Sequence, residues 1–324
     1  MDDKKYKNIL IVQIGKIGDM ILTTPLFTKL KELFPDSGIT VLASPINAEI
    51  AEYHKFVDNV IVYHKNLLSF LHLIKKLRKN KYDLWIDTKK EFSRTSSLFL
   101  KFSNPEHSAG FNSKKNIFEI DLTKYCNREH SIDINLSILK YFGVELSGFI
   151  RPSVYIPKLI IDDIEIKMKY VKGNTILINI SSGNMGRFWK RDNWVRLIEK
   201  LREVNPVIIT GVKQDEEMIQ SIFHNCKGKN LFYLKTESVL EFAGLIERSK
   251  LLISPDTSAV HFASCFDTPV IAFYNNVEWN YKRFAPLSTK QKVFISSSPD
   301  SLDSIPVNNV LDAVNDMMKS IVKS

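Results

Sequence analysis

The chain alternates short apolar runs with longer segments of helical periodicity, and the alternation occurs in both halves. The first half has strand-like runs at Ile9–Ile14, Ile39–Ala43, Asn59–Tyr63 and Leu84–Asp87. The second half has them at Thr175–Ile180, Val207–Thr210, Leu231–Leu234, Leu251–Ser254 and Val270–Phe273. Strands separated by helix-length segments favour parallel βαβ units, because parallel neighbours need a crossover connection. We therefore expect an α/β fold of doubly wound parallel sheets.

The segment Val144–Lys158 separates the two alternating halves. It contains several turn-forming residues and has no helical period, as is typical of a linker. We expect an N-terminal domain over residues 1–157 and a C-terminal domain over residues 158–324. A length of 324 residues is enough for two domains with sizeable cores. Ligands of such sheets bind beyond the carboxyl ends of the strands, so we expect a cleft between the domains.

Composition limits the possible functions. The net charge of +9 favours an anionic partner, but the basic residues are dispersed and no nucleic-acid-binding motif is present. The three cysteines and seven histidines lack metal-ligand spacing, so we expect no metal site. No apolar run approaches the ~20 residues that span a bilayer, and the start of the chain lacks the features of a signal peptide. We expect a cytoplasmic enzyme that does not bind nucleic acid.

The turn after the first strand carries the first candidate for chemistry. It reads Gly15-Lys16-Ile17-Gly18-Asp19 and leads toward a helix. A carboxylate at this position acts either as a general base at the edge of a cleft or as a helix cap. The turn does not match the GxGxxG pattern of dinucleotide-binding sites, and the chain contains no phosphate-binding P-loop motif.

A second turn, Ser254–Ala259, also follows a strand and opens a helix. Free backbone N–H groups, hydroxyls and the helix dipole suit a phosphate or diphosphate there. The same side chains are also ordinary helix caps. His261 lies on the same face of this helix as Thr257 or Ser258. It is either a ligand contact or a histidine packed against the protein.

Two more turns lie at strand ends in the second half. The turn Ser181–Arg191 combines small polar residues with cations that suit a diphosphate, or it is a solvated loop anchored by Trp189. The turn Thr210–Glu216 carries Glu216, whose carboxylate either meets ribose hydroxyls or is a surface acid at a helix start.

The helix expected at Leu67–Lys79 is apolar at its start and basic at its end. Such a helix either rests on an anionic membrane surface or packs on the core and exposes a charged last turn. Both interpretations stay open at the level of sequence.

These motifs resemble glycosyltransferase family 9, the ADP-heptose lipopolysaccharide heptosyltransferases. The resemblance is carried by Gly18-Asp19-Met20-Ile21 with Thr24-Pro25, by Arg187-Phe188-Trp189, and by Asp256-Thr257-Ser258-Ala259-Val260-His261. Asp87 with the downstream Ser93-Arg94-Thr95-Ser96 resembles a further family segment on the acceptor side.

The resemblance implies a two-domain GT-B fold and an inverting, metal-independent enzyme with no cofactor. Its implied reaction moves a heptose from ADP-heptose to a lipopolysaccharide or lipooligosaccharide inner-core acceptor. The alternatives are another nucleotide-sugar donor or a non-catalytic nucleotide-sugar binding protein. An anionic glycolipid acceptor implies peripheral contact with the cytoplasmic face of the inner membrane.

The resemblance and the turns together predict the site residues. Asp19 is the expected general base, and Gly18, Lys16 and Arg94 are expected on the acceptor side. The expected donor-binding residues are Ser182, Gly183, Arg187, Trp189, Gly211, Glu216, Asp256, Thr257, Ser258, Ala259 and His261.

Overall fold

The chain folds into two compact units. The computed structural model describes residues 6–113, 115–146, 148–183, 185–226 and 228–322. Unit 1 comprises Met1–Tyr155 and unit 2 comprises Ile156–Ser324, so the division falls two residues before the expected one. Ser147 of the expected linker and Asn184 of the third turn lie outside the described residues.

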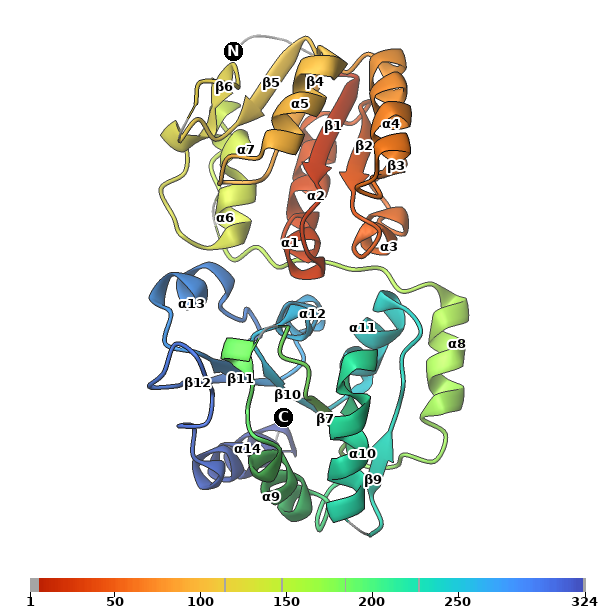
Figure 1. Ribbon diagram of the computed structural model, residues 1–324, viewed down its shortest axis with the longest axis vertical. Coiled ribbons are helices and arrows are strands. Elements are labelled where there is room, and N and C mark those ends of the chain that lie inside the picture. Colours follow the sequence, from red (N-terminus) through yellow and green to blue (C-terminus); the bar gives the residue numbers. More distant parts are fainter. Residues whose placement is uncertain (1–5, 114, 147, 184, 227, 323–324) are drawn as a thin grey trace. The chain divides into compact units, whose positions relative to one another are not determined.

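Unit 1 is built on a parallel sheet of strand order β3-β2-β1-β4-β5-β6 (Figure 1). Its strands are β1 (Asn8–Gln13), β2 (Gly38–Ala43), β3 (Asn59–Val62), β4 (Leu84–Asp87), β5 (His107–Gly110) and β6 (Ile120–Asp121). The order reverses at β1, which pairs with both β2 and β4. The loops that follow β1 and β4 therefore meet at the switch point of the sheet, where ligands of such folds bind.

Helices cover the sheet of unit 1. They are α1 (Ile17–Ile21), α2 (Thr24–Leu33), α3 (Ala48–Glu52), α4 (Leu67–Asn80), α5 (Arg94–Ser103), α6 (Ser131–Asn135) and α7 (Ser137–Tyr141), with a 3₁₀ turn at Leu122–Lys124. On one face, Leu73 and Leu77 of α4 and Phe99 of α5 join a buried cluster with Leu10 and Val12 of β1. Alternation along β1 sends its other apolar side chains to the opposite face.

Unit 2 repeats the architecture with strand order β12-β11-β10-β7-β8-β9. Its strands are β7 (Ile176–Asn179), β8 (Val207–Thr210), β9 (Leu231–Tyr233), β10 (Leu251–Pro255), β11 (Val270–Tyr274) and β12 (Gln291–Ile295). The order reverses at β7, which pairs with β10 and β8. The loops after β7 and β10 thus lie at the switch point of the second sheet.

The helices of unit 2 cover both faces of its sheet. They are α8 (Lys158–Lys167), α9 (Arg191–Leu201), α10 (Glu216–Asn225), α11 (Val239–Arg248), α12 (Ser258–Phe266), α13 (Glu278–Phe284) and α14 (Val307–Val322), with 3₁₀ turns at Met185–Arg187 and Lys213–Asp215. Side chains of α9, α10 and α14 share one buried cluster with β7 and β8. Within the described residues, no helix is both long and apolar enough to cross a bilayer.

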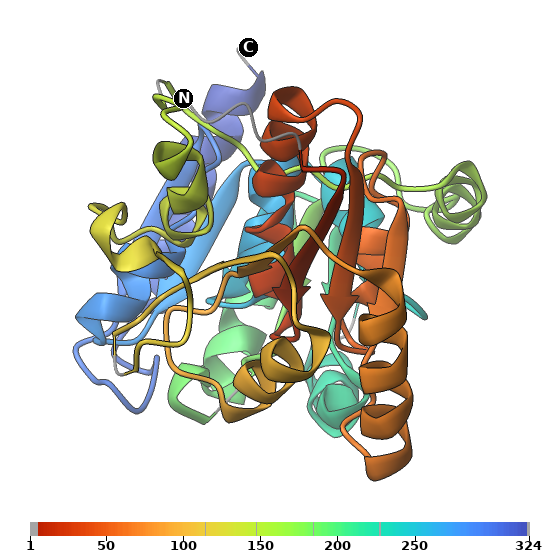
Figure 2. The same ribbon diagram turned by 90° about the horizontal axis from the view of Figure 1, so that it is seen from above.

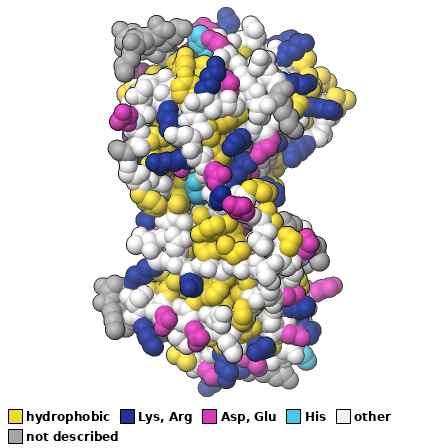
Figure 3. All heavy atoms as spheres, turned by 90° about the vertical axis from the view of Figure 1, so that its left-hand side faces the viewer, with side chains coloured by type: hydrophobic (Ala, Val, Ile, Leu, Met, Phe, Trp, Pro, Cys, Tyr) yellow, Lys and Arg dark blue, Asp and Glu magenta, His cyan; other side chains and the backbone are white. Residues whose placement is uncertain are grey.

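The charge pattern of the surface agrees with the dispersed basic residues of the sequence. On the face shown in Figure 3, cationic and acidic side chains are interspersed and form no continuous basic track.

Candidate functional site

Asp19 lies at the carboxyl edge of the first sheet, one turn into α1. Its Oδ2 accepts the backbone N–H of Lys16 at 2.9 Å, so the carboxylate does cap the short helix. Its Oδ1 accepts no hydrogen bond from a described residue, and the side chain is half-buried. One oxygen is therefore fixed while the other is available to take a proton.

Gly15 allows this arrangement. A Cβ atom at position 15 would lie 2.7 Å from Asp19 Oδ2 and 2.8 Å from the side-chain oxygen of Gln13. Both distances are well inside van der Waals contact, so any larger residue would displace the carboxylate.

A buried polar network supports the turn from beneath. Gln13 Nε2 donates to Thr23 Oγ1 at 2.9 Å and to Thr88 Oγ1 at 2.8 Å. Thr23 Oγ1 in turn donates to the carbonyl oxygen of Asp19 at 2.8 Å. These three polar side chains are all buried. Because buried hydrogen bonds are costly to leave unmade, the network fixes α1 to the strands β1 and β4.

Arg94 is placed by a second buried carboxylate. Asp87, at the end of β4, accepts the hydroxyl of Ser96 and, at 2.9 Å, the backbone N–H of Lys89. Burial raises the pKa of Asp87, and the Ser96 hydrogen bond opposes that shift. These bonds tie down the β4–α5 loop, and Arg94 begins α5 with its side chain exposed. Gly18 and Lys16 belong to the Asp19 turn, where Lys16 is exposed.

In unit 2 the first turn of α12 lies at the end of β10. Thr257 is the N-cap, and its Oγ1 accepts the backbone N–H of Ala259 at 3.3 Å. Asn179, the last residue of β7, donates to Thr257 Oγ1 at 3.1 Å and to Ser254 Oγ at 2.9 Å. The helix start is therefore locked to two adjacent strands, with Thr257 and Ser258 half-buried.

Arg187 is bound to the same turn. Its guanidinium donates to the carbonyl oxygen of Asp256 at 2.8 Å and to Asn280 Oδ1 at 3.1 Å, and it pairs with Asp256 Oδ2 at 3.1 Å. Asn280 also donates to Asp256 Oδ2 at 2.6 Å. Burial, together with the charge of Asp256, raises the pKa of Tyr274 well above its usual range.

This cluster refines the expected role of Asp256. Only 3% of its side chain is exposed, against 20% for Arg187. Asp256 thus orients Arg187 from below, and Arg187 is the member of the pair whose side chain is partly exposed. A buried ion pair with further hydrogen bonds keeps such a cation in one position.

Two expected donor contacts lie in the core of unit 2. Trp189 is 1% exposed, donates its indole N–H to the carbonyl oxygen of Ile305 at 3.3 Å, and packs against Trp194 and Phe273. It anchors its loop from beneath, the alternative that the sequence left open. His261 is also buried, with its ring centroid 6.0 Å from that of Phe284.

The remaining donor-side residues border the β7 and β8 ends. Ser182 is half-buried, and Gly183 is exposed with a φ of 67° that favours glycine. Gly211 begins the loop after β8. This loop is closed by Asp215, whose Oδ2 accepts the backbone N–H of Val212 at 3.1 Å. Glu216 is half-buried at the start of α10, and its carboxylate makes no hydrogen bond or ion pair with a described residue.

The sequence interpretation missed the amide side chains of the site. Asn179 could have been found, because a polar residue closes an apolar strand at a carboxyl end. Gln13 gives the same signal at the end of β1. Asn280 has no such signal, since it comes from α13, a helix that the sequence pattern did not indicate.

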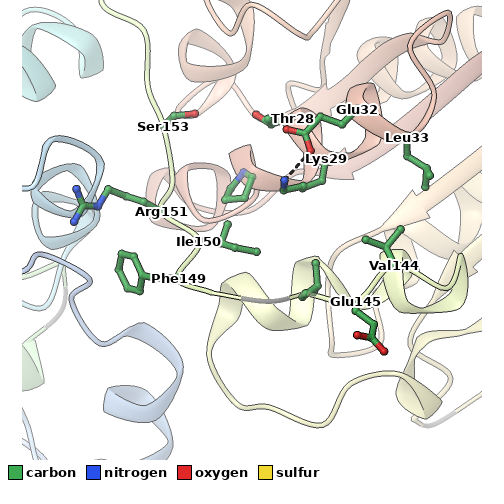
Figure 4. Close-up of a pocket in the computed structure, with 12 residues that line it drawn as sticks. Thr28, Lys29, Glu32, Leu33, Val144, Glu145, Phe149, Ile150, Arg151 and Ser153 are labelled. Atoms are coloured by element: carbon green, nitrogen blue, oxygen red, sulfur yellow. Dashed lines mark hydrogen bonds and ion pairs between the residues drawn. The ribbon is translucent and has the colours of Figure 1, made fainter.

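A cavity of about 590 Å³ lies elsewhere in unit 1 (Figure 4). It is bordered by α2, including the Lys29–Glu32 ion pair, and by the segment 144–153, including Phe149. Its described lining residues include none of the predicted site residues. The polar strand-end loops therefore mark the candidate site better than this concavity does.

Comparison with known proteins decides the family. A sequence profile of glycosyltransferase family 9 (heptosyltransferase) matches residues 70–304, well over half of the chain. The chain belongs to glycosyltransferase family 9. It is therefore a glycosyltransferase, and the resemblance to this family that the sequence motifs indicated is confirmed. The matched segment of this family member includes Arg187 and the α12 turn, whereas Asp19 precedes it.

Individual relatives agree with the family. Lipopolysaccharide heptosyltransferase 3 of Escherichia coli is 24% identical over 273 residues, covering 79% of this chain and 80% of the relative. A family 9 glycosyl transferase from Veillonella parvula superposes with a TM-score of 0.86 at 19% identity, covering 99% of both chains. An Escherichia coli heptosyltransferase solved with ADP gives a TM-score of 0.77 at 15% identity, covering 96% and 99%. The expected GT-B fold class of two parallel-sheet domains is confirmed, and the expected cleft between the domains stays a prediction.

Proposed function

We propose that this family 9 enzyme transfers a heptose from ADP-heptose to an inner-core acceptor of lipopolysaccharide or lipooligosaccharide, with inversion at the anomeric carbon. The proposal rests mainly on the α12 turn, because the helix start and the Arg187 guanidinium lie together at the end of one strand. The lipopolysaccharide heptosyltransferase among the relatives supports the sugar and the acceptor class.

On the donor side, the α12 turn binds the diphosphate. The first turn of a helix carries unpaired N–H groups and the positive end of the dipole, and both stabilise an anion. Thr257 and Ser258 lie at this helix start, Ala259 follows them with its N–H donated to Thr257 Oγ1, and Arg187 adds a cation beside them. Ser182 and Gly183 border the same group, while Glu216 and Gly211 lie toward the ribose and the base. The related heptosyltransferase solved with ADP supports an adenine nucleotide here.

On the acceptor side, Asp19 acts as the general base. An acceptor hydroxyl gives its proton to the open Oδ1 as its oxygen bonds to C1 of the heptose. The bond from C1 to the diphosphate breaks at the opposite face, which inverts the anomeric centre and leaves ADP. General-base catalysis of this kind contributes about 10²–10⁴-fold to a rate. Lys16 and Arg94 supply positive charge for an anionic acceptor, and Gly18 leaves room for it to approach.

Charge stabilisation at the leaving group completes the mechanism. As the C1–O bond breaks, negative charge grows on the diphosphate. The fixed N–H dipoles of α12 and the Arg187 guanidinium meet that charge without reorganising, because buried partners already hold them. Asp256, Asn280 and Asn179 act as positioning residues in this scheme.

A donor screen by calorimetry tests the proposal. Wild-type protein is titrated with ADP, ADP-heptose, UDP and UDP-glucose. We expect the adenine nucleotides to bind at least about tenfold more tightly, a difference of about 1.4 kcal/mol. Selectivity for UDP would refute the assignment of ADP-heptose as donor. Arg196→Ala serves as a control variant, because Arg196 is an exposed arginine of α9.

A further inference from the structure

Helix α4 runs beside the sheet of unit 1 (Figure 2), and its first two turns carry exposed leucines. Leu67, Leu68 and Leu71 are 73%, 81% and 56% exposed. The opposite face of the same helix buries Leu73 and Leu77 against the sheet. Packing on the core therefore accounts for one face of α4 and leaves the outward leucines unexplained. Three exposed leucines within two helical turns form an apolar patch, unlike single surface leucines, which are common.

Cations continue the same stripe. Leu68, Leu71, Lys75 and Lys79 follow one another at helical spacing of three or four residues, so they share one face. Lys76 is exposed beside them. The outward face of α4 is thus apolar over its first two turns and basic over its last two.

No acid offsets this charge nearby in the sequence. Residues 59–82 contain six Lys or Arg and no Asp or Glu. Lys75, Lys76 and Lys79 form no ion pair with a described residue, whereas Arg78 packs onto Phe102. The mixed signs on the face in Figure 3 show that such segregation is not general for this surface.

We propose that α4 is a membrane-docking surface, with Leu67, Leu68 and Leu71 inserted among the acyl chains of an anionic bilayer and the lysines at its headgroups. Aliphatic side chains gain by burial at the headgroup–acyl boundary, and each lysine gains from the negative surface potential. Charge complementarity selects an anionic bilayer as the occupant, because a run of cations without acids suits a uniformly negative surface. The inference rests on the proposed function for its lipid-linked acceptor.

The position of the patch suits that acceptor. Strand β3 ends at Val62 and α4 begins at Leu67, capped by Asn66, whose side chain accepts the backbone N–H of Ser69 at 2.8 Å. The leucines therefore begin at the carboxyl edge of the sheet, the same edge that holds the Asp19 turn. A bilayer on this patch would bring lipid-linked substrates to the acceptor side of unit 1.

Vesicle co-sedimentation tests the inference. The probes are phosphatidylcholine vesicles with and without phosphatidylglycerol. One variant combines Leu67→Ser, Leu68→Ser and Leu71→Ser, and a second combines Lys75→Glu, Lys76→Glu and Lys79→Glu. The matched control combines Leu159→Ser and Ile166→Ser on α8, which are 73% and 69% exposed beside three acidic residues. All substitutions are at exposed positions, and circular dichroism confirms folding.

We expect the wild type and the control to bind vesicles with phosphatidylglycerol and to bind neutral vesicles far less. The leucine variant should lose about 10–100-fold in affinity, and the lysine variant at least about 100-fold. Undiminished binding of either α4 variant to vesicles with phosphatidylglycerol would overturn the proposal. So would wild-type binding to those vesicles that is no stronger than binding to neutral vesicles.

A transfer assay with a delipidated core oligosaccharide separates this inference from the proposed function. Both α4 variants should transfer heptose to that soluble acceptor at the wild-type rate, since neither changes a site residue. If neither the wild type nor the variants transfer heptose, and the vesicle results are as expected, the proposed function is wrong and the docking surface is supported. If the α4 variants lose soluble transfer as well, α4 acts on the site and the docking assignment is wrong.

Discussion

In the proposed mechanism, some side chains of the candidate site meet the substrate and others hold those side chains in place. Asp19 and Arg187 belong to the first group, and both have one part fixed and another part accessible. Gln13 and Asp256 belong to the second, because they are buried and bond to the first. Fixing a reactive group in advance lowers the cost of reaching the transition state.

Arg187→Ala should weaken ADP binding. A charge-assisted hydrogen bond contributes roughly 1.5–3 kcal/mol, so the dissociation constant of ADP should rise about 10–150-fold. Binding of AMP, which lacks the second phosphate, should change less, and Arg187→Lys should recover part of the loss. Calorimetry with both nucleotides measures this, with Arg196→Ala as control. An unchanged ADP affinity in Arg187→Ala would remove the guanidinium from the donor site.

His54 should make the protein less stable in mild acid. Burial, with a smaller contribution from Lys55, lowers the pKa of His54 from 6.5 to about 4. Its Nδ1 accepts the backbone N–H of Phe56 at 3.4 Å, as a neutral ring does. Between these two pH values the unfolded chain binds a proton that the folded chain does not. The free energy of unfolding should thus fall by up to about 3 kcal/mol from this group as pH drops through that window.

Urea unfolding at several pH values checks the effect of His54. His54→Gln should show a smaller loss of stability between pH 7 and pH 4 than the wild type does. His224→Gln, at an exposed position, is the control. Parallel pH profiles for wild type and His54→Gln would contradict the buried, neutral state of the ring.

Most elements follow from sequence pattern, and those that do not share physical causes. The strands β4 and β8 have the expected bounds, because their apolar runs are continuous and buried. The short strands β5, β6 and β12 were missed, since they are partly exposed and weakly apolar, and β6 and β12 lie at sheet edges. Residues 131–141 form two short helices, α6 and α7, that meet at Leu136.

The site was predictable where it lies at strand ends and unpredictable where it depends on tertiary contacts. Gly18-Asp19 and Thr257-Ser258 lie at the starts of the helices that follow β1 and β10, so their placement follows from the parallel topology. The pairing of Arg187 with Asp256 joins residues 69 positions apart and is completed by Asn280 of α13. No local pattern encodes such a contact.

The helix cap of α12 gives a prediction at the scale of an element. Thr257→Ala should lower the free energy of unfolding by about 0.5–2 kcal/mol through loss of the cap. It should also raise the dissociation constant of ADP about 2–10-fold, because the turn loses a hydroxyl and its order. Thermal unfolding and calorimetry measure the two effects, and Thr257→Ser should restore both.

Ser238 provides a matched control for that cap. Its side chain caps α11 in the same manner, accepting the backbone N–H of Glu241 at 3.1 Å. Ser238→Ala should cost similar stability and leave ADP affinity unchanged. Equal losses of ADP affinity in the two variants would show that Thr257 acts only through general stability.

For the whole molecule, we predict that transfer continues in excess EDTA. Among the described residues, no three His, Cys, Asp or Glu side chains cluster in a way that could hold a metal ion. In the proposed mechanism, the α12 dipole and Arg187 provide the positive charge that the leaving diphosphate needs. Turnover measured with and without the chelator decides the matter. Loss of transfer that Mg²⁺ or Mn²⁺ restores would contradict the prediction.

The proposed function requires Asp19 to be the base that takes the proton of the acceptor hydroxyl. Asp19→Asn separates this role from helix capping, because the asparagine oxygen can still accept the Lys16 N–H and keep the helix cap, while the base is lost. We measure heptose transfer from ADP-heptose to the glycolipid acceptor beside ADP affinity by calorimetry. We expect turnover to fall at least about 100-fold while ADP affinity stays within about twofold. Turnover within about tenfold of the wild type would reduce Asp19 to a helix cap and refute its role as the base.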